Sequence, residues 1–435
     1  MSPTRHRAKR WLALPLVVAS LLAAAACSSP APAGPDEPVS LRISTWGNDN
    51  RVRITQQAID AFTAANPTIK VTLENSQWGA YWDKLATGMA ANDTPDVIQM
   101  DESYFAAYGS RASLLDLTQV SGGLDLSTME ATALDTGKVE GEQVGVPVGL
   151  TNLAIAVNPS LLEKAGVAMP DDKTWTWDDY NTIAAQVTGK LGGEGVYGNG
   201  GMGLEAYSLG FWARQQGEEI FPTEGQKPLT EATVASHFDY VKKAVATKAT
   251  PPVEVQVENI AGALDSSLMA TNAAAFGTIW TTQVSAYGAA SGSHLELLRL
   301  PAMEPGEPHM VNKASMYWSI SSRTEHPEEA AKLIQFLLTD PAATDLLTTE
   351  RGIPAIDEVR ERVADKVDDQ ARVALEFSDA VAPELVSPPQ VTPASASAFT
   401  GEYTLIATDV LFERTSSAEG ATRVIQLLEG MADGA

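Results

Sequence analysis

The order of expected elements over residues 39–102 constrains the fold of this chain most strongly. Alternating apolar residues at 39–43 and 69–73 predict two strands, and the apolar run Val97–Met100 predicts a third. Apolar residues at helical spacing lie between each strand and the next. Strand–helix–strand–helix–strand with short connections predicts an α/β domain whose parallel strands are joined by right-handed crossovers.

Polar and aromatic residues follow each of these three expected strands. In open α/β sheets, ligands bind outside the carboxyl ends of the strands. The residues at those ends are Trp46, Asn48, Gln77, Trp78, Asp101 and Glu102. The sequence therefore predicts a binding site at this edge of the sheet.

Residues 144–166 predict the passage of the chain from one domain to another. Residues 146–148 form a short apolar piece, residues 153–157 suit a buried strand, and a capped helix follows them. Gly149–Asn152 lies between the two pieces and is flexible and polar. We expect a hinge there, together with a ligand contact by Asn152.

Residues 1–26 have the form of a secretory signal, with a basic start, a short apolar segment and small residues before Cys27. The small residues resemble a bacterial lipobox, which makes Cys27 a candidate lipidation site, although Ala24 stands where Leu is commoner. Ordinary cleavage that leaves Cys27 as an incidental residue is the alternative. A membrane span is disfavoured because Pro15 interrupts a run shorter than the roughly 20 apolar residues required. Residues 27–38 predict a disordered tether rich in Pro, Ala and Gly.

Charge and cysteine content exclude several classes of function. Removing the predicted signal leaves 409 residues, enough for two domains, and takes the formal net charge from −25 to −29. Such a field disfavours nucleic acid and polyanionic ligands, so a neutral or cationic ligand fits better, although acidity can also serve solubility alone. A single cysteine excludes an internal disulfide and a thiolate metal cluster. The five histidines lack ligand spacing, so no metal site is predicted.

The second half of the chain also alternates between expected strands and helices. Thr176 is expected to cap a helix, and the Gly-rich residues 192–203 are expected to form a loop. Helices are predicted at 204–216, 264–270, from Pro327, at 402–414 and at 418–431; strands at 273–276, 295–301 and 314–320; and a surface loop at 387–397.

Several separate stretches resemble one known family. They are VPVGLTNLAIAVNPSLLEKAGV, TPDVIQMDESYF, TWTWDDY, AAAFGTIW, and HPEEAAKLIQFLL followed by RGIPA. Their order and spacing over most of residues 40–435 are similar to the extracellular solute-binding proteins of bacterial ABC importers, family 1, the carbohydrate-binding group. The resemblance implies a two-lobed, type II periplasmic-binding-protein-like α/β fold, in which each lobe has a central, mostly parallel sheet flanked by helices and a hinge joins the lobes.

The same resemblance implies a division of the chain into two discontinuous lobes. Residues 39–150 and 278–322 would form the first lobe, and residues 151–277 and 323–435 the second. The chain would then cross the hinge near residues 150, 278 and 322.

Tryptophan faces can stack on the apolar face of a sugar ring, and eight tryptophans remain after the predicted signal. Trp46, Trp280 and Trp318 are candidate stacking residues, with core packing as the alternative, whereas the helical spacing of Trp82 favours the core. Asn48, Gln77, Asp101 and Asn152 are candidate hydrogen-bond partners of hydroxyl groups, and the resemblance suggests that Asp101 accepts from neighbouring hydroxyls. Trp78, Tyr317 and Arg351 complete the predicted ligand-binding set, with contact to the partner as the alternative for Arg351.

Two patterns that suggest an enzyme are weak in their context. Asp101 and Glu102 are adjacent and point apart, whereas a glycosidase needs two carboxylates about 5–10 Å apart across the bond. The glycines at 198, 200 and 203 match a dinucleotide fingerprint, but only Val196 and Tyr197 precede them as a possible strand, so a glycine loop is favoured and no cofactor is expected.

The expected function is the capture of a mono- or oligosaccharide between two lobes by hinge closure, and its delivery to an importer permease. We expect a monomer outside the cytoplasm that is held at the outer face of the cell membrane only by a lipid on Cys27. An exported polysaccharide-degrading enzyme is one alternative. A binding protein for another solute, such as a polyamine or a peptide, is the other.

Overall fold

The computed structural model describes residues 38–122, 124–129, 131–307, 310–386 and 389–433. The predicted signal, Cys27 and all of the predicted tether except Pro38 lie outside these ranges. Residues 39–435 form one compact unit. In the described part of the chain, every helix is too short or too polar to cross a membrane.

The N-terminal part of the main sheet is built from the three predicted strands. β1 (Val39–Trp46) lies between β2 (Ile69–Ser76) and β3 (Val97–Met100), and both pairings are parallel. The crossovers are α1 (Asp49–Ala65) and α2 (Trp78–Ala91), as their apolar spacing predicts. The parallel arrangement brings the carboxyl ends of all three strands to one edge.

The strand β6 (Val146–Val157) joins two parts of an eight-stranded sheet. Its first residues pair antiparallel with β12 (Asn312–Ile320), which also pairs with β3. Its last residues pair antiparallel with β10 (Ala274–Trp280) and β11 (Glu296–Leu298), and β10 pairs in parallel with β7 (Tyr197–Asn199). The sheet is therefore mixed, with its parallel pairings on either side of the antiparallel strands β6 and β12.

Residues 149–152 differ from the prediction of a flexible, loop-like link. They lie inside the single twelve-residue strand β6, where Asn152 pairs with Asn312 and Leu150 bridges to Ile353. A Cβ atom on Gly149 would lie 2.8 Å from the backbone of Gly352, so close packing against this turn requires glycine at position 149.

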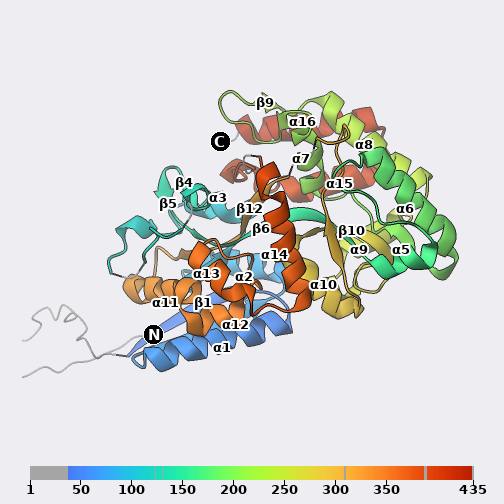
Figure 1. Ribbon diagram of the computed structural model, residues 1–435. Helices are drawn as coiled ribbons and strands as arrows, with labels where there is room; N and C mark the ends of the chain where they lie inside the picture. The colour runs from blue at the N-terminus through green and yellow to red at the C-terminus, as the bar shows by residue number, and fades with distance from the viewer. Residues whose placement is uncertain (1–37, 123, 130, 308–309, 387–388, 434–435) are drawn as a thin grey trace, which may run out of the picture. The chain divides into compact units, whose positions relative to one another are not determined.

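Two large hydrophobic clusters flank the two parts of the sheet. The first cluster contains residues of β1 and α1 together with α11 (Pro327–Thr339), α12 (Pro341–Leu347) and α13 (Asp357–Ala364). Figure 1 shows these helices grouped around β1. The second contains the last residues of β6 with β10, α6 (Trp177–Leu191), α7 (Ala206–Arg214), α8 (Glu231–Ala246), α15 (Phe399–Leu411) and α16 (Ser417–Asp433).

This packing differs from the predicted division of the chain at two places. β11 pairs with the second part of β6, so the chain returns to the first part of the sheet after residue 298 rather than near 278. Leu333 and Ile334 of α11 share a core with Leu41, so the helices directly after residue 322 stay with the first cluster. The division into two lobes itself stays a prediction.

The remaining elements are shorter. The helices are α3 (Glu102–Gly109), α4 (Ala131–Asp135), α5 (Pro159–Ala165), α9 (Val253–Ala261), α10 (Val284–Ser291) and α14 (Asp369–Val381); the strands are β4 (Lys138–Val139), β5 (Glu142–Gln143), β8 (Glu218–Glu219) and β9 (Lys227–Pro228); and the 3₁₀ turns are η1 (Leu117–Gln119), η2 (Gly192–Glu194), η3 (Leu264–Ser266), η4 (Thr281–Gln283), η5 (Ala382–Glu384) and η6 (Ala394–Ala396).

Three predicted elements have different bounds. The Gly-rich loop contains the short strand β7, because residues 197–199 pair with β10. The helix predicted at 264–270 is reduced to the 3₁₀ turn η3. β10 runs on to Trp280, so Trp280 is the last residue of the strand rather than part of the loop after it. The cap of α6 is confirmed, because Thr176 and Asp179 form a capping box.

The strand registers turn the carboxyl ends of the two parallel groups toward each other. On β6, the end of β3 is level with Pro147, since both Met100 and Pro147 pair with Tyr317 of β12. The end of β10 is level with Leu153, which pairs with Trp280, and β10 runs in the opposite direction to β1 and β3. Both edges therefore face residues 148–152 of β6.

Candidate ligand-binding site

An aromatic cluster, made up of Trp46, Trp78, Tyr81, Trp82 and Tyr104, lies at the carboxyl ends of β1 and β2. The ring centroids of Trp46 and Trp78 are 5.1 Å apart at an interplanar angle of 82°, and those of Trp82 and Tyr104 are 4.0 Å apart and stacked. Trp78 is 44% exposed, whereas Trp46 and Trp82 are buried. The cluster therefore presents one accessible indole on a rigid aromatic base.

The local sequence explains this arrangement. Trp46 pairs with Ser76, so β1 and β2 end side by side. Gln77 then occupies the N-cap of α2, and the helix begins at Trp78 and places Trp82 one turn later. The prediction of Trp82 as a core residue is confirmed by its burial.

The predicted polar residues at this edge have different local roles. Asn48 Oδ1 accepts a hydrogen bond of 3.0 Å from the backbone N of Arg51, which caps α1. Asp101 Oδ1 accepts one of 2.9 Å from the backbone N of Ser103, which caps α3. Gln77 is exposed and makes no capping bond with its side chain. All three lie at the strand ends, as predicted, and whether they contact a ligand stays a prediction.

Glu102 and Lys313 connect this edge to the end of β10. Glu102 Oε1 accepts hydrogen bonds from the backbone N and the Oγ1 of Thr392, at 2.7 and 2.8 Å. Lys313 Nζ lies 3.7 Å from Glu102 Oε2 and 4.6 Å from the ring centroid of Trp280. One ammonium group thus touches both the first residue of α3 and the last residue of β10.

Beyond Trp280 lie two residues at the start of α7. The rings of Trp280 and Tyr207 meet edge to face with centroids 5.7 Å apart. Tyr207 Oη donates a hydrogen bond of 2.6 Å to Glu205 Oε2, and Glu205 is the N-cap residue of α7. Both side chains are partly exposed. An aromatic pair and a carboxylate therefore lie at the carboxyl end of the second parallel group.

Burial dominates the electrostatics of these side chains. It raises the pKa of the Glu205 carboxyl above its ordinary value, and the hydrogen bond from Tyr207 opposes this shift. Burial, followed by the charge of Glu205, raises the pKa of Tyr287 to about 12. The phenols beside Glu205 therefore stay neutral at physiological pH.

Three predicted ligand contacts lie in the core instead. Trp318 and Tyr317 are each 1% exposed, and Tyr317 stacks on Phe105 with centroids 4.4 Å apart. Asn152 is buried and its amide is used internally: Nδ2 donates to the carbonyl oxygen of Val311 at 3.3 Å, and Oδ1 accepts from Ser378 Oγ at 2.7 Å. These three residues build the sheet between the two edges and leave no free surface for stacking or hydrogen bonding.

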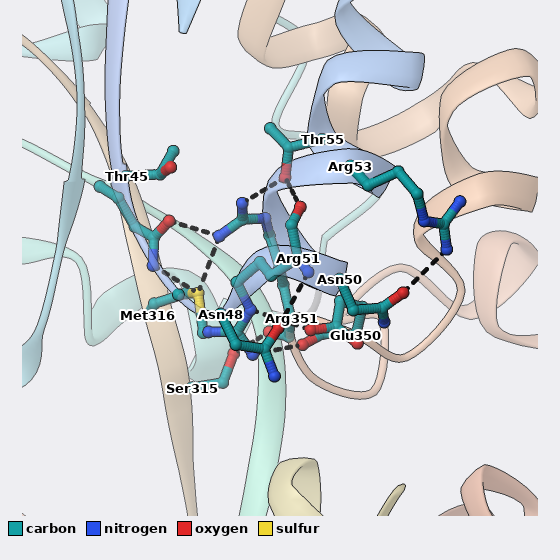
Figure 2. Close-up of polar contacts among 12 residues, drawn as sticks. Thr45, Asn48, Asn50, Arg51, Arg53, Thr55, Ser315, Met316, Glu350 and Arg351 are labelled. Carbon is teal, nitrogen blue, oxygen red and sulfur yellow. Dashed lines mark hydrogen bonds and ion pairs between the residues drawn. The ribbon is translucent and has the colours of Figure 1, made fainter. Parts of the chain in front are cut away.

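Arg351 is also buried and forms the polar network in Figure 2. Its Nη2 donates to Thr55 Oγ1 at 2.6 Å, and its Nη1 donates to Gln99 Oε1. Burial lowers its pKa to about 9, and the charge of Arg51 acts in the same direction. The prediction that Arg351 faces a ligand is therefore wrong for this structure, because its guanidinium is directed into the first core.

Residue-by-residue reading of the sequence missed Glu205, Tyr207 and Lys313 as site residues. The available signal was their position: Glu205 follows the strand β7, which was hidden in the Gly-rich stretch, and Lys313 is the second residue of β12. A surface hollow of about 280 Å³ lies elsewhere, between Leu115, Val120 and Pro327, and no residue of the two strand edges lines it.

Residues 57–374 match the model of a bacterial extracellular solute-binding protein family. The chain belongs to this family. It is a family of binding proteins, which agrees with a site made of aromatic and polar side chains at facing strand ends.

Known relatives align with only part of the chain. It is 27% identical over 172 residues to an uncharacterized lipoprotein from the oleD 5' region of Streptomyces antibioticus, which covers 39% of this chain and 38% of that protein. It is 24% identical over 192 residues to the diacetylchitobiose binding protein DasA of Streptomyces coelicolor, 43% of each. The matches thus span about two fifths of the length of these relatives.

A solved structure resembles nearly the whole fold. It is a periplasmic oligogalacturonide binding protein from Yersinia enterocolitica in complex with saturated digalacturonic acid, with a TM-score of 0.78 and 20% identity. The match covers 91% of this chain and 99% of that one. The predicted fold class, the mixed α/β fold of periplasmic solute-binding proteins, is confirmed.

Proposed function

We propose that this solute-binding protein captures a carbohydrate between the facing edges of its sheet and delivers it to the permease of an ABC importer. The observation that carries the proposal is the exposed indole of Trp78 on the aromatic cluster at the end of β2, together with the partly exposed Trp280 at the end of β10. Flat indole faces suit the apolar face of a sugar ring. The two relatives named for saccharide ligands belong to the same class of binding proteins.

In this proposal the stacking residues are Trp78 and Trp280, and the buried Trp46 supports the ring of Trp78 from below. Four polar side chains form hydrogen bonds with hydroxyl groups of the ligand in this proposal: Asn48, Gln77, Asp101 and Glu205. A dissociation constant near 1 μM requires about −8 kcal/mol, which a few stacked rings and satisfied hydrogen bonds can supply. Because the two edges belong to different core clusters, a ligand that touches both favours the conformation in which they are close.

The proposed anchoring completes the role in import. A lipid on Cys27 would hold the protein at the outer face of the cell membrane. Mass spectrometry of the purified mature protein tests this directly: a lipid-modified N-terminal cysteine is expected. An unmodified Cys27 would remove the anchor from the proposal and leave ligand binding untouched.

Thermal-shift screening against sugars, polyamines and peptides, followed by titration calorimetry with the best ligand, tests the proposed class. A saccharide is expected to raise the melting temperature, and Trp78→Ala is expected to weaken binding at least about tenfold while the fold is retained. Leu405→Ala is the matched control, since Leu405 is 61% exposed on α15. A response to peptides or polyamines alone, with none to sugars, would overturn the saccharide class.

Turnover separates the proposal from an exported polysaccharide-degrading enzyme. Incubation with oligosaccharides is expected to leave their chain length unchanged. Shorter products that disappear with a Glu205→Gln variant would favour the enzyme instead.

Small-angle scattering tests the proposed closure. It is expected to show compaction with ligand, and identical profiles would count against closure.

A further inference from the structure

Glu205 is a carboxylate without a cationic partner at the proposed site. Its side chain accepts one hydrogen bond, from Tyr207 Oη to Oε2, and it forms no ion pair with any of the residues that the structure describes. The neighbouring carboxylate Glu102 differs, because it is held by Lys313 and Thr392. The groups that act electrostatically with Glu205 are the phenols of Tyr207, Tyr287 and Tyr403, which cannot neutralise it.

Aromatic rings lie beside Glu205. Together with its carboxylate, they could bind an ammonium group. Tyr207 is bonded to the carboxylate and meets Trp280 edge to face. The ring of Trp280 already carries the ammonium of Lys313 at 4.6 Å. Aromatic faces combined with a carboxylate are the chemistry that recognises organic ammonium groups. The structure itself thus shows that the Trp280 ring accepts an ammonium.

The charged groups at the two strand edges also favour a cationic ligand. Asp101, Glu102 and Glu205 contribute three carboxylates at the two strand edges, and Lys313 lies beside one of them, Glu102. The whole chain has a formal net charge of −25. A ligand with carboxylate groups would meet this negative field, whereas a ligand with a positive charge would be attracted by it.

We propose that the ligand is a saccharide that carries a protonated amino group, and that Glu205 pairs with this group while Tyr207 and Trp280 enclose it. This inference rests on the proposed function and adds the ligand class to it. A partly buried carboxylate forms a stronger hydrogen bond with an ammonium group than with a hydroxyl group, because both partners of the first bond are charged.

Titration calorimetry at mildly acidic pH and low salt tests the proposal with matched ligands. A short glucosamine oligosaccharide, in which the amine is charged, is compared with its N-acetylated form, with a glucose oligosaccharide, with a galacturonate oligosaccharide and with spermidine. The wild-type protein is expected to bind the free amine at least about tenfold more tightly than the N-acetylated form. This comparison changes only the ligand and does not depend on any variant folding.

Glu205→Gln then assigns the effect to the carboxylate. It is expected to remove the preference for the free amine over the N-acetylated form, so that the two ligands bind within about threefold of each other. Glu254→Gln, at an exposed position of α9, is the matched control and should leave the preference unchanged. Circular dichroism melts establish that both variants fold.

The remaining outcomes separate this inference from the proposed function. Equal binding of amine and N-acetylated or neutral sugars overturns the ammonium subsite and leaves carbohydrate binding intact. Preference for the galacturonate ligand overturns it as well. Binding of spermidine with no binding of any saccharide overturns the saccharide class and the proposed function with it.

Discussion

Nη2 of Arg351 donates a hydrogen bond of 2.6 Å to Oγ1 of Thr55, which ties the turn after α12 to the first helix. Thr55 Oγ1 donates in turn to the carbonyl oxygen of Arg51 at 2.7 Å. Arg351 is 3% exposed and forms no ion pair among the described residues; Glu350 beside it pairs with Arg51. Within the part of the chain that the structure describes, the hydrogen bonds of this buried guanidinium thus go to neutral side chains.

Replacing Arg351 with Met tests whether these neutral contacts stabilise the fold. The variant removes the donor to Gln99 Oε1 and leaves that amide oxygen without its partner, so the free energy of unfolding should fall by about 1–3 kcal/mol. The double variant Arg351→Met/Gln99→Leu removes both polar groups and should recover to within about 1 kcal/mol of wild type. Urea unfolding measures wild type, Arg351→Met, Gln99→Leu and the double variant, with the more exposed Arg360→Met as control.

A double variant that is as unstable as the sum of its two single variants would contradict this explanation. It would mean that Arg351 acts through packing against Trp318, whose ring centroid lies 5.2 Å from the guanidinium carbon, rather than through its hydrogen bonds.

Gly149→Ala tests the close contact between β6 and the turn at residues 350–353. The added methyl would lie 2.8 Å from the backbone of Gly352 and from the carbonyl oxygen of Ile353, both of which are rigid, so we expect a loss of at least about 2 kcal/mol of stability. Gly189→Ala is the control, because its Cβ would meet nothing within 4 Å on α6, and it should stabilise the protein by about 0.5–1 kcal/mol. Equal effects of the two changes in urea unfolding would show that this contact is loose.

The N-terminal part of the main sheet was predictable from sequence because its strands and helices follow one another directly along the chain. β1, β2 and β3 alternate with helices whose apolar spacing is regular, and the ends of these strands follow from parallel pairing. The placement of α11 was not predictable from Leu333 and Ile334 themselves. The apolar face of α11 would fit either hydrophobic cluster. Only the packing against Leu41, far away in the sequence, shows that α11 belongs to the first cluster.

The candidate site was predicted at one edge and misjudged at the other. Trp78 and Asp101 follow strands that the sequence shows clearly, whereas β7 has three residues within a Gly-rich stretch, which hid Glu205. Trp318 was misjudged because an aromatic residue in a strand does not tell which face of the sheet it joins, and that choice depends on the irregular pairing of β12 with β6 around Met316. Arg351 was misjudged because its partners, Thr55 and Gln99, are 296 and 252 residues away in the sequence.

His237 makes the free energy of unfolding depend on pH between about 3 and 6.5. Its imidazole is fully buried on α8 between Ser208 and Tyr403, and burial lowers its pKa from 6.5 to about 3. Between these two values the unfolded chain binds a proton that the folded protein does not, so stability falls as the pH is lowered below about 6.5. The expected loss is roughly 1.4 kcal/mol per pH unit, or about 2 kcal/mol at pH 5.

Urea unfolding of wild type and His237→Phe at several pH values between 5 and 7 measures this slope. The variant should lose most of the slope, whatever its stability at pH 7, and the exposed His294→Phe should retain it. Carboxylates with a lowered pKa, such as Glu218, bind protons at lower pH and are present in both proteins, so they do not affect the difference in slope between wild type and His237→Phe. A wild-type slope that persists in His237→Phe would assign the acid sensitivity to other groups.

Trp280 and Trp318 were equivalent candidates in the sequence, and the structure predicts opposite consequences for their removal. Trp280 is partly exposed at the end of β10, so Trp280→Ala should weaken ligand binding at least about tenfold with a small change in melting temperature. Trp318 is 1% exposed in the first core, so Trp318→Ala should cost about 3–5 kcal/mol of stability. Its affinity, measured by calorimetry where the variant is folded, should stay within about threefold of wild type. Unchanged affinity of Trp280→Ala would place the ligand elsewhere, and a binding loss in Trp318→Ala without a stability loss would reverse the assignment.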